Sequence, residues 1–132
     1  MFSTNAFGYI NVLNSAADAA WKRNEILNNN IANVDTPGFK RQDLKFEFVL
    51  ENEIARQGKT ASTLDEKVRN VDYTRLKPWV YTDNSELSNR LDGNNVDIDT
   101  EEAELASNQL MYDGLINGIN SEFQRIKTVL GK

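Results

Sequence analysis

The sequence contains no cysteine and no histidine among its 132 residues. Without cysteine, the chain can form no disulfides, cysteine-ligated zinc sites or thiol nucleophiles. Without histidine, it lacks the commonest general base, the usual partner of a nucleophilic serine and a frequent metal ligand. Catalysis would have to depend on carboxylates, lysine, tyrosine or serine alone. We therefore expect a protein that is not an enzyme and that binds no cofactor and no metal.

Basic charge and long apolar runs are also scarce. Twenty acidic residues outnumber 15 lysines and arginines, and the formal net charge is −5 at pH 7. Because duplex nucleic acid is bound through basic faces, no nucleic-acid partner is expected. No segment approaches the ~20 apolar residues that span a bilayer, so we predict no direct membrane insertion. The N-terminus lacks the basic and apolar regions of a secretory signal peptide, which predicts a cytosolic protein or export without such a cleaved signal.

Asparagine is abundant, with 17 residues, and charge divides the chain into three parts. Residues 1–34 carry no net charge, residues 35–96 carry a net charge of −1, and residues 97–132 carry −4. The length allows about one domain. We expect an N-terminal helix over 1–34, a linker and small, partly extended middle segment over 35–96, and a C-terminal helix over 97–132.

The first part has the apolar repeat of a helix. Its repeat advances by three and four residues in strict alternation, which places the members on one seam of a helix. The seam consists of Ile10, Leu13, Ala17, Ala20, Asn24, Leu27, Ile31 and Val34. Because Pro37 disfavours the α conformation at Thr36, the helix is predicted to stop near Val34. Pro37 and Gly38 then suit the two central positions of a type II turn.

The last part repeats this design. Its seam consists of Leu105, Gln109, Tyr112, Ile116, Ile119, Phe123, Ile126 and Leu130. Asp99 is the predicted N-cap, with Glu102 as its capping-box partner, and Glu101 is expected to complement the helix dipole. The interior glycines Gly114 and Gly118 suggest close approach of another backbone. Apolar residues also lie off this seam, so one partner helix cannot cover the whole helix.

The middle part is less regular. The segment from Leu44 to Ile54 fits either a short helix or a strand, residues 58–62 fit a loop, and residues 71–81 are predicted to be extended, with Pro78 at an edge or irregular position. The expected fold class is therefore mainly α, with the long terminal helices paired as a coiled-coil-like hairpin around a small, partly extended middle segment. The residues alone leave open whether the two seams bury each other within one chain or against neighbouring copies.

The acid-rich stretch from Asp92 to Asp99 does not form a calcium-binding EF-hand loop. Such a loop needs glycine at its sixth position and glutamate at its twelfth. A loop that starts at Asp92 has Asp97 and Ala103 there, and one that starts at Asp97 has Glu102 and Asn108. We expect a turn at Asp92 and Gly93, followed by a capped helix start.

Two motifs resemble those of a known family. The first, within NNNIANVDTPGFK, contains Asn29, Asn30, Ile31, Ala32, Asn33, Thr36, Pro37 and Gly38. The second, within DGNNVDIDTEEAELASNQLMY, contains Asp92, Gly93, Asn94, Val96 and Asp97. In this order, and near opposite ends of a short chain, they are similar to the signatures of the bacterial flagellar basal-body rod proteins, and the second motif favours the proximal-rod members. The resemblance covers about residues 8–47 and 90–130.

The resemblance implies a structural subunit that self-assembles through its terminal helices into the axial tube that transmits torque. It implies as partners copies of the same chain, other rod and basal-body proteins, and the flagellar type III export apparatus. It also implies a place in the periplasm-spanning rod of the basal body, reached without a cleaved signal peptide. The assembly interface is expected on the two seams, from Ile10 to Ile31 and from Leu105 to Leu130. The alternatives are another rod subunit, or a soluble helical-hairpin adaptor for one partner helix.

Overall fold

The computed structural model describes residues 5–58, 63–85 and 90–131. In chain order, the elements are α1 (Asn5–Ala32), β1 (Gln42–Lys45), α2 (Glu47–Arg56), α3 (Leu64–Arg69), the 3-10 turn η1 (Tyr73–Arg75), β2 (Trp79–Thr82) and α4 (Ile98–Val129). The predicted fold class, mainly α with long terminal helices that pack together, is confirmed. None of the helices that the structure describes is apolar enough over a sufficient length to cross a membrane.

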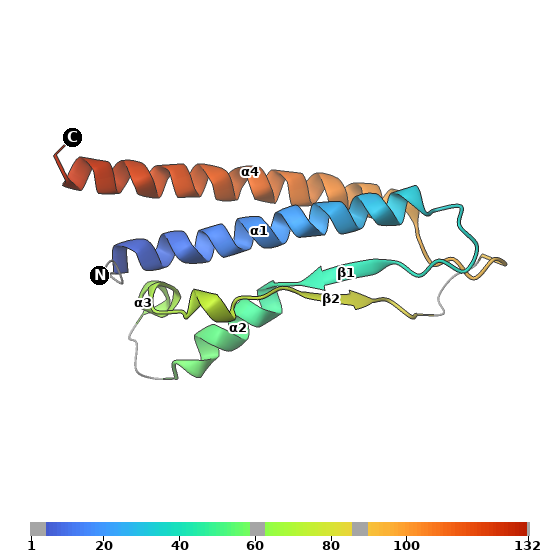
Figure 1. The fold of residues 1–132 in the computed structure, drawn as a ribbon, viewed down its shortest axis with the longest axis horizontal. Coiled ribbons are helices and arrows are strands. Elements are labelled where there is room, and N and C mark those ends of the chain that lie inside the picture. The colour runs from blue at the N-terminus through green and yellow to red at the C-terminus, as the bar shows by residue number, and fades with distance from the viewer. Residues whose placement is uncertain (1–4, 59–62, 86–89, 132) are drawn as a thin grey trace.

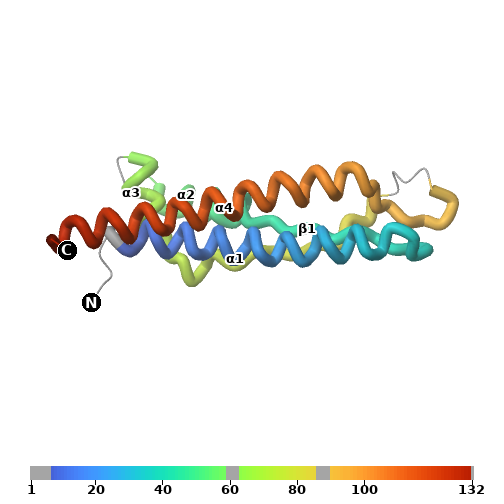
Figure 2. The backbone as a smooth tube through the Cα atoms, turned by 90° about the horizontal axis from the view of Figure 1, so that it is seen from above, coloured from blue at the N-terminus to red at the C-terminus, as the bar shows by residue number. Residues whose placement is uncertain are grey.

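The molecule is elongated, and α1 lies between α4 on one side and the middle region on the other (Figure 1). The two long helices run in opposite directions and lie side by side along their length (Figure 2). Helix α4 packs mainly on α1, whereas α1 also packs on β1 and α3. Helix α1 therefore has two covered faces, while much of the circumference of α4 has no neighbour within the described chain.

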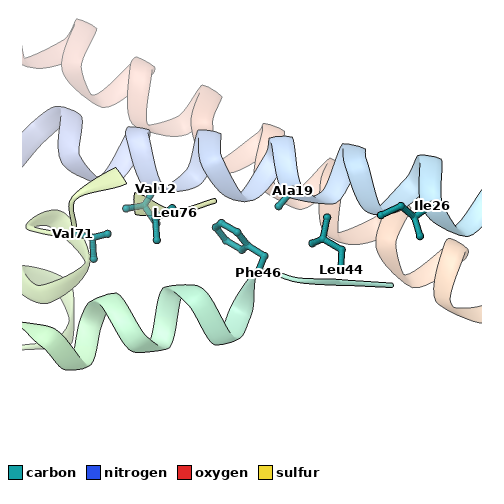
Figure 3. Packing of buried hydrophobic residues seen from close by; sticks show 7 residues of the cluster. All are labelled: Val12, Ala19, Ile26, Leu44, Phe46, Val71 and Leu76. Atoms are coloured by element: carbon teal, nitrogen blue, oxygen red, sulfur yellow. The ribbon is translucent and has the colours of Figure 1, made fainter. Parts of the chain in front are cut away.

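The main apolar core lies between α1 and the middle region (Figure 3). It consists of Val12, Ala19 and Ile26 from α1, with Leu44, Phe46, Val71 and Leu76. Burial of each large apolar side chain contributes roughly 1.5–3 kcal/mol. This second face of α1 was not predicted, because its members are sparse beside the stronger repeat of the other seam.

The two strands form an antiparallel pair in which Gln42 lies opposite Thr82 and Lys45 opposite Trp79. Side chains of α1 occupy the other edge of β1. Asn30 Nδ2 donates to the carbonyl of Gln42 (2.8 Å), the N–H of Gln42 donates to Asn30 Oδ1 (2.9 Å), and Arg23 donates to the carbonyl of Leu44 (2.8 Å). These bonds satisfy backbone groups that an edge strand would otherwise leave unpaired.

The middle segment combines the structures that the pattern left open. Residues 44–54 contain the end of β1 and most of α2, so strand and helix follow each other. The prediction of extended structure over residues 71–81 was wrong at η1 and right from Trp79, directly after Pro78. Helix α3 was not predicted, although Thr63 caps it by accepting from the N–H of Glu66 (3.2 Å). Of the predicted loop, residues 59–62 lie outside the described residues.

The turn after α1 has the predicted form. Helix α1 ends at Ala32, two residues before the predicted end at Val34. The N–H of Phe39 donates to the carbonyl of Thr36 (3.2 Å), and Gly38 has φ of +72°. A positive φ at the third residue is what a type II turn requires, and glycine adopts it without steric cost.

The predicted cap of α4 was wrong by two residues. The N-cap is Asp97, whose side chain accepts from the N–H groups of Asp99 (3.1 Å) and Thr100 (3.3 Å). Asp97 has the extended backbone that an N-cap needs, with φ of −104° and ψ of 109°, whereas Asp99 lies inside the first turn.

Candidate assembly interface

The two sequence motifs meet where the hairpin of long helices turns. Asn94 is fully buried, and its Nδ2 donates to the carbonyls of Asn33 (2.9 Å), Val34 (3.0 Å) and Thr36 (2.8 Å). Its Oδ1 accepts from the N–H of Val96 (2.7 Å). Carbonyls at the end of a helix have no intrahelical donor. Those of Asn33 and Thr36 accept from N–H groups of the following turn. The second motif adds the donors of Asn94, so it helps to cap the helix that the first motif ends.

The turns of the two motifs also lie against each other. The N–H of Gly38 donates to the carbonyl of Asp92 (2.7 Å), and Lys40 Nζ donates to the carbonyl of Gly93 (2.6 Å). Gly93 has φ of +75°, and a Cβ there would lie 3.8 Å from Gly38 Cα. The backbone N–H of Asn94 donates to Asp92 Oδ1 (3.1 Å) and lowers the pKa of that carboxyl. The predicted turn at Asp92 and Gly93 is confirmed.

A buried carboxylate joins α4 to the rest of the fold. Glu101 is 1% exposed and accepts from Arg41 Nε and from Asn30 Nδ2 (3.0 Å). Arg41 also pairs with Asp43 (3.2 Å) and Asp83 (3.5 Å). Burial lowers the pKa of Arg41, but the hydrogen bond and charge of Glu101 outweigh it, so this pKa lies above its ordinary value. Removal of one partner from such a buried pair costs about 3–5 kcal/mol, because the other charge stays buried.

Sequence reasoning missed the role of Glu101. It expected this carboxylate only to complement the helix dipole, whereas the structure buries Glu101 and leaves Glu102 and Glu104 exposed. No local signal distinguishes the three, because the partner Arg41 lies 60 residues away in the sequence. Within the part of the chain that the structure describes, no group of three acidic side chains is placed to hold a metal ion.

The seam predicted on α1 lies against α4 of the same chain. Ile10, Ala17, Ala20 and Leu27 are buried, and Leu13, Asn24 and Ile31 are half-buried. Asn108 Nδ2 donates to the carbonyl of Ala20 (2.8 Å), and a Cβ at Gly118 would lie 3.7 Å from the Leu13 side chain. These seven residues thus hold the hairpin of the single chain together.

The seam predicted on α4 lies partly to one side of the row that faces α1. Leu105, Tyr112, Ile116, Ile119 and Ile126 are half-buried, but Gln109, Phe123 and Leu130 are exposed. The most covered positions of the helix follow another three-four repeat, made of Glu101, Leu105, Asn108, Tyr112, Leu115, Ile119, Glu122 and Ile126. Glu101, Asn108 and Glu122 of this row are polar. The apolar pattern therefore favoured the predicted seam, which shares only Leu105, Tyr112, Ile119 and Ile126 with this row. A Cβ at Gly114 would meet no atom within 4 Å, unlike one at Gly118.

Large apolar side chains of α4 remain uncovered in the single chain. Leu110 is 74% exposed, Phe123 51%, Val129 85% and Leu130 69%. The last two also line a hollow of about 390 Å³ at the open end of the hairpin, together with Phe7, Arg69, Glu122, Arg125 and Ile126. Extended exposed apolar surfaces are typical of sites that bind other proteins.

Known proteins with similar sequences are flagellar. The profile of the family described as "Flagella basal body rod protein" matches residues 10–40. The flagellar basal body rod protein FlgB of Bacillus subtilis is 34% identical over 124 residues, which cover 93% of this chain and 93% of that protein. FlgB of Borreliella burgdorferi is 36% identical over 82% of this chain and 84% of its own length. FlgB of Escherichia coli is 29% identical over 83% of each chain.

Proposed function

Because this chain belongs to the FlgB family of flagellar basal body rod proteins, we propose that the uncovered faces of its helical hairpin bind neighbouring rod subunits. The protein is a structural subunit of the basal-body rod, and it is not an enzyme. Its place is the flagellar basal body, where it assembles with other basal-body components.

The exposed apolar residues of α4 support the proposed assembly surface. Phe123 and Leu130 belong to the predicted seam, yet they lie in solvent in the single chain. Burial of each such side chain by a neighbour would contribute roughly 1.5–3 kcal/mol. The same contact, repeated around an axis, produces a helical tube. In this proposal the seam from Ile10 to Ile31 keeps the hairpin together, and the exposed side of α4 makes the contacts between subunits.

We also propose the finer set of partners and the route to the rod. The partners would be copies of this chain, other rod proteins and the flagellar type III export apparatus. The protein would reach the periplasm-spanning rod without cleavage of a signal peptide. Family membership supports this proposal, as does an apolar helix surface that a free monomer would leave in water.

The experiment that tests this function introduces a charge on the exposed face of α4. Ile119 is a poor site for the change, because it is half-buried in the row facing α1 and a carboxylate there would disturb the monomer. Phe123→Asp alters a side chain that is already 51% exposed. We expect this variant to match the wild type in helicity and melting temperature but to fail to enter the rod, so that cells lack hooks and filaments.

The control is Gln124→Asp, which places the same charge on the adjacent exposed residue. It should leave both the monomer and motility unchanged. A strain that builds complete flagella with Phe123→Asp would contradict the proposed assembly surface.

A further inference from the structure

A polar groove lies between α1 and α4, near the middle of the hairpin. It encloses about 270 Å³ and is lined by Ala20, Trp21, Asn24, Asn108, Gln109, Tyr112 and Asp113. The lining thus combines amide, aromatic and acidic side chains, and it contains no basic residue.

Two buried hydrogen-bond acceptors belong to residues that line this groove. Asn108 is 4% exposed, and its Nδ2 is engaged by the carbonyl of Ala20, which fixes which end of the amide is the oxygen. The Oδ1 atoms of Asn108 and Asn24 are buried, and neither accepts a hydrogen bond from the residues that the structure describes. Buried polar atoms nearly always have a partner. Two such oxygens beside one groove leave a place for a donor, which a group from outside the chain can supply.

The other lining residues indicate the kind of donor. The rings of Trp21 and Tyr112 have centroids 5.9 Å apart and are tilted by 49°, and Trp21 is 57% exposed. Asp113 adds an exposed carboxylate to the lining. A guanidinium group suits this combination, because it offers five N–H donors, carries positive charge and stacks on aromatic faces.

This chain is a poor source of that guanidinium. Six of its seven arginines already form ion pairs with carboxylates of their own chain: Arg23, Arg41, Arg56, Arg69, Arg90 and Arg125. The chain also carries a net charge of −5, so two copies repel each other at long range.

We propose that the groove receives an arginine side chain from a neighbouring rod subunit of a different, more basic sequence. The proposal rests on the proposed function, since it requires that α1 and α4 face other rod proteins. It adds a specific polar contact to the apolar surface that includes Phe123.

A titration of the isolated protein tests the chemistry of the groove. The probe is N-acetyl-arginine amide. Its binding is monitored in NMR spectra through the side-chain amide signals of Asn24 and Asn108 and the indole signal of Trp21. We expect saturable shifts of these signals and binding roughly threefold or more tighter than that of N-acetyl-citrulline amide, which has a similar shape but no charge.

Two variants separate binding from folding. Asn108→Leu removes both the acceptor and the donor to Ala20 at similar volume. Because the buried apolar side chain offsets the lost hydrogen bond, the melting temperature should change little, while the shifts at Asn24 and Trp21 disappear. Asn117→Leu, at an exposed position of α4, should bind the probe like the wild type. Absence of shifts in the wild type, or equal shifts in Asn108→Leu, would show that the groove holds water only, and the proposal would be wrong.

Cross-linking in cells identifies the partner. A photoreactive benzoylphenylalanine in place of the exposed Gln109 should form an adduct with another rod protein, at a peptide that contains arginine. An adduct with a second copy of this chain, or an adduct far from any arginine, would overturn the choice of partner. Normal rods in an Asn108→Leu strain would overturn the groove proposal, whereas the proposed function is decided separately by Phe123→Asp.

Discussion

Replacement of Asn94 by alanine would test whether the second motif stabilises the end of α1. The Asn94 side chain donates to the carbonyls of Asn33, Val34 and Thr36 and accepts from the N–H of Val96. Each hydrogen bond contributes about 0.5–1.5 kcal/mol net, and buried groups left without partners cost more. Each of these carbonyls keeps another donor: the N–H of Thr36 for Asn33, Arg90 for Val34 (2.5 Å) and the N–H of Phe39 for Thr36. The N–H of Val96 loses its partner, so we expect Asn94→Ala to lower the free energy of unfolding by about 2 kcal/mol.

Asn94→Asp provides a second, pH-dependent measurement at the same site. The new carboxyl keeps an acceptor for Val96 but loses the donor and faces three carbonyl oxygens. Burial and these oxygens disfavour its charged form, whereas the Arg90 guanidinium, which donates to the same Val34 carbonyl, favours it. We expect burial and the oxygens to dominate, so that the folded-state pKa rises above the unfolded value of about 3.9. The variant should therefore be most stable below about pH 4 and lose stability as the pH rises through the folded-state pKa. At pH 7 it should be less stable than Asn94→Ala.

The assay is urea unfolding followed by circular dichroism at 222 nm, at pH 4 and pH 7. Asn117→Ala is the control, because Asn117 is exposed on α4 and its replacement should stay within about 0.5 kcal/mol of the wild type. A loss below about 1 kcal/mol for Asn94→Ala would refute the proposed capping role. So would an Asn94→Asp variant that is more stable than Asn94→Ala at pH 7.

Three other substitutions test separate contacts. Gly8→Ala would place a Cβ 2.1 Å from the carbonyl oxygen of Arg69, so α1 and α3 must separate at a cost of about 1–3 kcal/mol; an unchanged melting temperature would contradict this contact. Gly38→Val would meet no atom within 4 Å but must adopt φ of +72°, which costs about 1–2 kcal/mol, and it should reduce motility; normal stability and swimming would count against the type II turn. The Arg23 guanidinium donates to Glu47 and holds the pKa of that carboxyl at about 2, below its ordinary 4.5. The wild type should therefore exceed Glu47→Gln in stability above pH 4.5 and lose this advantage as the pH falls towards 2. Because the Glu47 side chain is 58% exposed, this advantage in stability should stay under about 1 kcal/mol. An advantage that persisted in full at pH 2 would contradict the effect of Arg23 on Glu47.

The sequence was most informative where structure is local. The three-four repeat of α1 predicted which of its residues lie against the other long helix, because a helical period converts spacing into position on a face. The dipeptide Pro37-Gly38 predicted the turn after α1, since proline restricts φ at its own position and glycine allows a positive φ at the next. The two motifs identified the family before any contact between them could be seen.

The same local rules fail where a residue's role depends on a distant partner. On α4, the apolar repeat favoured the row with Phe123 over the adjacent row with Asn108 and Glu122, because polar residues weaken an apolar pattern even when they are covered. The cap of the helix is Asp97 and not Asp99, because Asp97 has the extended backbone and its side chain accepts from two N–H groups of the first turn. Residue type alone does not distinguish the two aspartates.

The sequence by itself therefore determined the two long helices, the turn that ends the first and the membership of the rod family. Only the tertiary structure decided that Asn94 caps α1 from about 60 residues away and that Glu101 is buried beside Arg41 while Glu102 stays in water. It also decided which apolar residues of α4 remain available to a neighbour. The physical reason is that helices and turns arise from interactions between residues close in sequence, whereas the burial of a polar group depends on partners that only the folded chain brings within hydrogen-bond distance.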